Sequence, residues 1–173
     1  MCIRDSPFAI LLLGAAVRAE LPAPDPDDGA IKLPAGFRAV VVADNLGPLR
    51  FLTVAANGDI YVKTREVGII GLRDADGDGR AEVKESFGSG GGTGIALRDG
   101  SLYHSTNSTV FRYKMTPGEL APDGRPEVVV KGLPDEKQHE AKSFTFDGDG
   151  RLYVEVGSPS NCLLYTSPSP RDS

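Results

Sequence analysis

The sequence predicts an all-β protein, a partial β-propeller of about three blades. A unit of short strand, turn and short strand occurs three times along the chain. Its tyrosines, Tyr61, Tyr103 and Tyr153, are spaced 42 and then 50 residues apart. Repeats of roughly 40–50 residues with several strands in each copy are typical of propeller blades. No long stretch shows helical periodicity, which favours the same fold class.

The third copy of the unit is a β-hairpin by periodicity and by turn composition. Phe144 and Phe146 alternate with polar residues, residues 147–150 supply Asp and Gly, and apolar residues alternate again over 152–156. The earlier copies occupy residues 51–62 and 94–104. Further strands are expected at 38–43, 67–72, 110–114 and 127–130, with turn signals between them.

The two ends of the chain can be back-translated to DNA sequences that are reverse complements of each other. Residues 1–6 can be encoded by ATGTGTATAAGAGACAG plus one base, and its reverse complement, CTGTCTCTTATACACAT, encodes residues 162–166 in one frame. Such mirrored ends resemble a sequencing adapter, so residues 1–6 and 162–173 are interpreted as adapter-derived and excluded from fold prediction. They carry the only cysteines, Cys2 and Cys162, so no disulfide or thiolate metal site is predicted.

An apolar run at residues 7–19 ends in Val17-Arg18-Ala19 and is interpreted as a truncated signal peptide. A truncated membrane anchor or a buried helix is the alternative. A Pro- and Asp-rich linker is expected at 20–33, followed by the propeller domain at 34–161. The predicted location is therefore periplasmic or secreted, without stable membrane insertion after cleavage. The net charge of −5 and the lack of a basic stripe argue against nucleic-acid binding.

An acidic stretch has the spacing of a calcium loop, with carboxylates at Asp74, Asp76, Asp78 and Glu85. Oxygen ligands alternating along a tight loop can wrap Ca²⁺, and a glutamate at the twelfth position can complete its coordination. The flanking residues are strand-like rather than helical, so the alternative is a solvated hairpin turn that uses Asp and Gly for its geometry.

Two histidines and a glycine-rich stretch remain. His104 takes the position of Val62 and is expected to pack in a strand. His139 stands at a loop-to-strand boundary, where propellers place functional groups. Residues 89–94 lie between strands and do not open a helix, which excludes a dinucleotide or phosphate cradle.

Several of these segments together resemble the soluble PQQ-dependent glucose and sorbosone dehydrogenases. The similarity covers residues 33–161 and is most specific from Gly132-Leu133-Pro134 through His139 to Gly157. It implies an exported, six-bladed quinoprotein that oxidises a sugar hydroxyl by hydride transfer to pyrroloquinoline quinone (PQQ). An external electron acceptor would then reoxidise the cofactor. The same similarity implies that His139 is the general base, a role that suits an imidazole near neutral pH.

The sequence departs from this family beside the histidine. Glucose-oxidising members have an Asp where this chain has Ser158, which leaves Glu140 or Glu155 as candidate partners of the imidazole. Gln138 also replaces an acidic residue. The family's cofactor-binding arginines and lysine and its cofactor-bound calcium belong to later blades, so this chain alone is expected to be inactive. The alternatives are a non-catalytic binding scaffold or a lactonase-type propeller.

Overall fold

The computed structural model describes residues 21–135 and 141–157. This part of the chain contains ten β-strands and one short 3-10 helix, η1 (Asp28–Ala30). None of the described segments forms a helix long and apolar enough to cross a membrane. The adapter-like ends, the predicted signal peptide and His139 lie outside the described residues.

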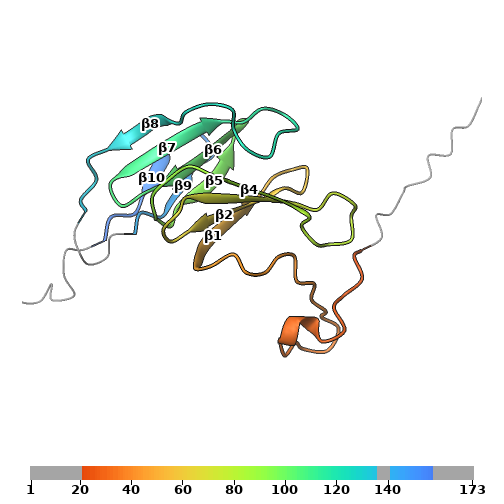
Figure 1. Cartoon of the computed structure of the whole chain (residues 1–173). Helices are drawn as coiled ribbons and strands as arrows, with labels where there is room; N and C mark the ends of the chain where they lie inside the picture. Colours follow the sequence, from red (N-terminus) through yellow and green to blue (C-terminus); the bar gives the residue numbers. More distant parts are fainter. Residues whose placement is uncertain (1–20, 136–140, 158–173) are drawn as a thin grey trace, which may run out of the picture.

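The strands form three antiparallel sheets in which each strand pairs with its neighbour in sequence (Figure 1). The first two sheets have four strands each and the third has two. This arrangement confirms the predicted all-β fold and the three copies of the repeat. The sheets contain β1 (Leu49–Val54), β2 (Ile60–Thr64), β3 (Ile69–Arg73) and β4 (Val83–Phe87); β5 (Ile95–Arg98), β6 (Ser101–Ser105), β7 (Thr109–Lys114) and β8 (Glu127–Lys131); and β9 (Phe144–Phe146) and β10 (Leu152–Val154).

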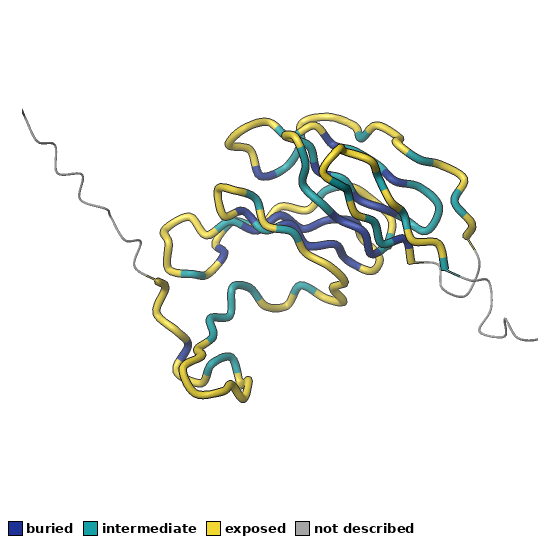
Figure 2. Tube along the Cα trace, turned by 180° about the vertical axis from the view of Figure 1, so that it is seen from behind, coloured by how far each residue is buried: buried dark blue, intermediate teal, exposed yellow. Residues whose placement is uncertain are grey.

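Burial is concentrated in β2 and β3 of the first sheet and in β6 of the second. In Figure 2 the buried trace runs through the middle of the molecule and the loops are exposed. Strand β2 is buried on both faces, because one face packs on the second sheet and the other on the N-terminal segment. The propeller-like stacking of sheets therefore explains a run of five largely buried residues.

The core between the first and second sheets is apolar and aromatic. Its buried members include Tyr61 and Ile69 from the first sheet and Leu102 and Tyr113 from the second. Phe87 links the sheets by edge-to-face contacts, with its ring centroid 6.3 Å from that of Tyr61 and 5.5 Å from that of Tyr113. Aromatic pairs in this geometry add about 0.5–1.5 kcal/mol to the burial of their surfaces.

The second and third sheets meet through Tyr103 and Phe146, whose ring centroids are 4.8 Å apart. Arg98 strengthens this contact by donating from Nη1 to the Asp147 carbonyl at 2.8 Å. The two sheets approach so closely that a Cβ on Gly94 would lie 2.3 Å from the Phe144 ring. The third copy of the repeat thus packs as a blade against the second.

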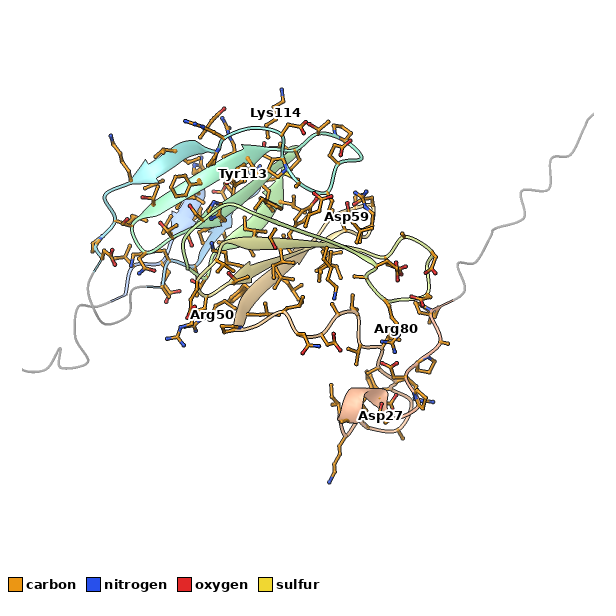
Figure 3. The ribbon with its side chains drawn as sticks, viewed as in Figure 1. Asp27, Arg50, Asp59, Arg80, Tyr113 and Lys114 are labelled. Carbon is orange, nitrogen blue, oxygen red and sulfur yellow. The ribbon has the colours of Figure 1, made fainter. Side chains whose placement is uncertain are left out.

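The prediction of a strand at residues 38–43 is wrong. These residues bond to the N-terminal segment instead of a sheet: Ala39 accepts from the Asp25 amide at 2.9 Å, and Val41 donates to Asp25 Oδ2 at 2.6 Å. Arg80 forms an ion pair with Asp25, which is itself buried. Residues 21–33, expected to be a linker, are therefore held against the first sheet's long loop, as Figure 3 shows near Arg80 and Asp27.

Candidate functional site

A pocket of about 340 Å³ lies at one end of the sheets, and we call it the loop pocket. In an antiparallel meander the start of the first strand and the connection between the second and third strands lie at the same end of the sheet. In the first sheet these are the start of β1 and the β2–β3 connection. The segment that enters β5, the β6–β7 connection and the segment that enters β9 continue this end in the next two sheets. The pocket is lined by residues of these connections: Arg50, Arg65, Glu66, Gly90, Gly91, Gly92, Thr93, Thr106, Asn107, Ser108, Asp135 and Ala141.

The pocket lining contains two basic residues, Arg50 and Arg65, and two acidic residues, Glu66 and Asp135, so its formal charges are equal in number. Arg50 lies at the beginning of β1, at the opposite end of the first sheet from Asp59 (Figure 3). The backbone of Arg65 is fixed by its amide, which donates to the Pro48 carbonyl at 3.0 Å. Guanidinium groups bind carboxylates through two parallel hydrogen bonds, so this end of the sheet suits a carboxylate-bearing ligand.

The glycine-rich stretch forms one wall of the pocket and has no room for side chains. A Cβ on Gly91 would lie 1.8 Å from the Arg65 carbonyl oxygen, and one on Gly92 would lie 2.2 Å from that of Ser105. The end of this wall is held by two hydrogen bonds, from the Gly94 amide to Ser105 Oγ and from the Ser105 amide to the Gly94 carbonyl, both at 2.9 Å. These glycines are needed for close backbone packing, which agrees with a loop rather than a phosphate cradle.

A buried lysine and a buried histidine meet behind this wall. Lys63 Nζ donates to the Gly90 carbonyl at 2.7 Å and lies 3.3 Å from His104 Nδ1. Lys63 is 0% exposed and His104 is 1% exposed. Burial lowers the pKa of Lys63 to about 8. Burial, together with the charge on Lys63, lowers the pKa of His104 to about 4.

The predicted catalytic residue, His139, lies outside the described residues, as do Gln138, Glu140 and Ser158. The described residues on either side of the 136–140 segment, Asp135 and Ala141, both line the loop pocket. Glu155 is exposed and does not line that pocket. His104, the other histidine, is a core residue stacked on Phe111 and Tyr113.

The acidic loop brings together a different set of carboxylates from the predicted one. Oxygens of Asp74, Asp76, Asp78 and Glu82 lie within 4.8 Å of one another, and Glu85 is not in this group. Strand β4 begins at Val83, so Glu85 is already paired in the sheet, opposite Gly71. The glutamate that lies close to the three aspartates is therefore Glu82, at the end of the loop, and not Glu85.

These carboxylates also stabilise the turn itself. Asp74 accepts from the amides of Gly77 at 2.7 Å and Gly79 at 2.8 Å, and Glu82 accepts from the Ala75 amide at 2.8 Å. The loop joins β3 to β4, so it lies at the opposite end of the first sheet from the loop pocket. It cannot share a ligand with the arginines of that pocket.

Sequence reasoning missed three charged residues at the pocket end, Arg50, Arg65 and Lys63. The family resemblance implied cofactor-binding arginines only in later blades, so it pointed to no arginine of this chain. The signal for Lys63 in the sequence is weak, because this lysine directly follows the apolar run Ile60-Tyr61-Val62 within the same predicted strand. Its partner His104 is 41 residues away in sequence, and only the stacking of two sheets brings them together.

The chain matches the model of the TrAA12-like family over residues 31–169. The holo form of the pyranose dehydrogenase PQQ domain from Coprinopsis cinerea has a TM-score of 0.60 and 18% identity, over 69% of this chain and 30% of that one. The calcium structure of the Trichoderma reesei family AA12 carbohydrate-active enzyme has a TM-score of 0.60 and 20% identity, over 69% and 32%. This chain thus spans about a third of the length of either structure. None of the curated proteins compared with the chain matches it.

Proposed function

Because the chain belongs to the TrAA12-like family, we propose that it is the N-terminal part of a PQQ-dependent sugar dehydrogenase. The observation that carries this proposal is the loop pocket. It places Arg50 and Arg65 in one lining with Asp135 and Ala141, the described residues nearest to the segment that bears His139. This proximity in sequence supports the proposal that the cofactor site and the general base lie at the same end of the propeller.

The residues of the loop pocket fit such a cofactor chemically. PQQ is a flat tricarboxylate, and guanidinium groups are the side chains best suited to hold carboxylates. The volume of about 340 Å³ is within the range of small-molecule sites. In this proposal Arg50 and Arg65 hold carboxylates of the cofactor in addition to the arginines and lysine that the family resemblance implies in later blades. When bound, the quinone supplies the two-electron acceptor for a hydride from the sugar.

The role proposed for His139 is that of general base. A ring nitrogen of His139 accepts the proton of the sugar hydroxyl while the carbon that bears this hydroxyl loses a hydride and its C–O bond becomes a carbonyl, so that no charged alkoxide has to form unaided. The substrate class is an aldose or a sorbosone-like sugar, and an external acceptor removes the electrons. The proposed location is periplasmic or secreted, because the interpreted signal peptide precedes the domain.

The test replaces His139 in the full-length protein reconstituted with PQQ. His139→Ala should lower turnover by roughly 10²–10⁴, which is the usual contribution of a positioned general base. The apparent affinity for the sugar should change much less, because the proton moves only in the transition state. Lys114→Ala is the control, since Lys114 is exposed and lies at the opposite end of the second sheet from the loop pocket. His104→Ala should affect stability before chemistry, because His104 is buried.

A second variant tests the residue that replaces the family's aspartate. Ser158→Asp should raise turnover if no other carboxylate already pairs with His139, and should leave it unchanged if Glu140 does so. Wild-type turnover by His139→Ala across several aldoses would remove the histidine from the mechanism. It would favour a binding scaffold on the same fold.

A further inference from the structure

We infer that Lys63 is a positioning residue for the loop pocket: its buried ammonium fixes the Gly90–Gly92 wall and supplies the positive charge that selects an anionic ligand. This inference deepens the proposed function and rests on it for the identity of the ligand. It begins from the position of Lys63, which lies on β2, fully buried, with its only described acceptors on another loop and another sheet.

The hydrogen bond to Gly90 ties the wall to the first sheet. Gly90, Gly91 and Gly92 have no side chains with which to anchor themselves, and Gly90 and Gly92 adopt left-handed φ angles of 77° and 155°. The 2.7 Å bond from Lys63 Nζ is charge-assisted and therefore among the stronger kinds of hydrogen bond. Without it, the carbonyl of Gly90 would lose this partner and the wall would be freer to move.

The pair with His104 keeps the charge on the lysine. An ammonium group can only donate, so His104 Nδ1 must accept and the imidazole proton must lie on Nε2. Among the described residues His104 Nε2 has no hydrogen-bond partner. The ring is also stacked on Phe111 and Tyr113, with centroids 5.2 and 5.7 Å away, and it is 1% exposed. Burial beside the Lys63 ammonium disfavours a second positive charge. The pair therefore carries one positive charge, located at Lys63.

This charge changes the electrostatic character of the pocket. The two arginines and two carboxylates of the lining cancel formally, so an ammonium directly behind Gly90 leaves an excess of positive charge there. The groups beside Lys63 do not offset it, because Phe51 on β1 and Ile69 on β3 are its apolar register partners.

The test measures PQQ binding without turnover in the full-length protein that carries this chain. Lys63→Met should weaken binding on the order of tenfold at pH 7, the size of one charge interaction near a protein surface. Lys114→Met is the matched control, since Lys114 is exposed and points away from the sheets in Figure 3. It should bind PQQ as the wild type does.

The pH profile separates a charge role from a merely structural one. With a pKa of about 8, Lys63 loses its proton between pH 7 and pH 9, so wild-type affinity for the carboxylates should fall across that window. His104, with a pKa of about 4, stays neutral throughout. Lys63→Met should lack this fall. Equal affinity and an equal pH profile in Lys63→Met and wild type would overturn the inference. If Lys63→Met does not fold, the wild type alone decides: an affinity for PQQ that stays constant from pH 7 to pH 9 would also overturn the inference.

Hydrogen exchange distinguishes failure of this inference from failure of the proposed function. In the ligand-free protein, amides of residues 90–93 should exchange faster in Lys63→Met than in Lys114→Met, whichever ligand the pocket takes. Unchanged exchange there would overturn the positioning role. If no variant binds PQQ but exchange rises as expected, the cofactor assignment is wrong while the positioning role of Lys63 stands.

Discussion

Asp59 anchors the β1–β2 turn of the first sheet through a two-pronged ion pair. Its carboxylate oxygens accept from Arg73 Nε and Nη2, both at 2.7 Å, and Asn57 Nδ2 adds a third bond at 2.8 Å. Asp59 is 3% exposed, so this carboxylate is shielded from water and needs its partners. In the third sheet the equivalent turn is held from its other end by Asp147, which accepts from the Arg151 amide and from Tyr153 Oη.

Asp59→Asn should destabilise the protein by about 2–3 kcal/mol, because it removes charge-assisted bonds to Arg73 inside the fold. Chemical denaturation would measure the loss. Asp99→Asn is the matched control in the second sheet, where the ion pair to Arg98 involves a carboxylate that is 87% exposed. That variant should lose no more than about 0.5 kcal/mol. Equal losses in the two variants would contradict the importance of burial.

The pH dependence of stability follows from the same carboxylate. The hydrogen bond from Arg73 holds the pKa of Asp59 below its ordinary value, so this contribution is present above the unfolded pKa near 3.9. It is lost as the pH falls through the lower folded pKa. Acid unfolding of the wild type should therefore be steeper below about pH 4 than that of Asp59→Asn. If the stability of both proteins fell equally with decreasing pH, Asp59 would not be a source of this pH dependence.

At the scale of elements, the glycine wall makes a steric prediction. Gly91→Ala should cost about 1–3 kcal/mol, since its methyl group would overlap the Arg65 carbonyl and force the loop outward. Gly148→Ala is the control, because a Cβ there meets nothing within 4 Å. Thermal unfolding of both variants checks this expectation. A Gly91→Ala protein as stable as the control would show that the wall can shift freely.

Calcium titration distinguishes the two interpretations of the acidic loop. The sequence-based prediction is that calcium binds there, which calorimetry would detect as heat of binding. Glu82→Gln should then weaken binding more than Glu85→Gln, because only Glu82 has an oxygen close to those of Asp74, Asp76 and Asp78. If calcium gives no heat, the carboxylates serve only the turn, whose amides they already accept.

The strands were predictable because their signals are local. Alternation and Asp-Gly turns are contained within each hairpin, as at Phe144–Phe146 and Leu152–Val154. Residues 38–43 have the same valine-rich composition but their hydrogen bonds go to Asp25 and Ala81, and composition does not reveal partners. The site was harder to predict, because it joins loops from successive blades. The pairing of Lys63 with His104 depends on how two sheets stack.

At the scale of the whole molecule, the first sheet leaves an apolar face open. Leu52 and Val54, which point to the same side of β1, are 59% and 55% exposed. An apolar groove of about 610 Å³ runs between this strand and residues 40–46. Blades bury such faces against their neighbours in a ring, and a large open apolar face favours association.

The chain, produced as it stands, should therefore self-associate as its concentration rises. Leu52→Ser should reduce this association in sedimentation velocity experiments by removing an apolar group from the open face. Val67→Ser is the control, because Val67 is 69% exposed but lies in the β2–β3 connection, away from that face. Equal association of the two variants would locate the contact elsewhere.

The order of the strands also bears on how the chain acquires its structure during synthesis. Within the described residues every strand pairs only with a strand adjacent in sequence, so the first sheet has all its ladder partners once Phe87 has been added. Short separations between partners make sheet formation fast, because little loop entropy is lost before contacts form. The first blade can thus form as the chain leaves the ribosome. Its Tyr61 and Ile69 side chains stay exposed until the second sheet, which carries Leu102 and Tyr113, packs against them.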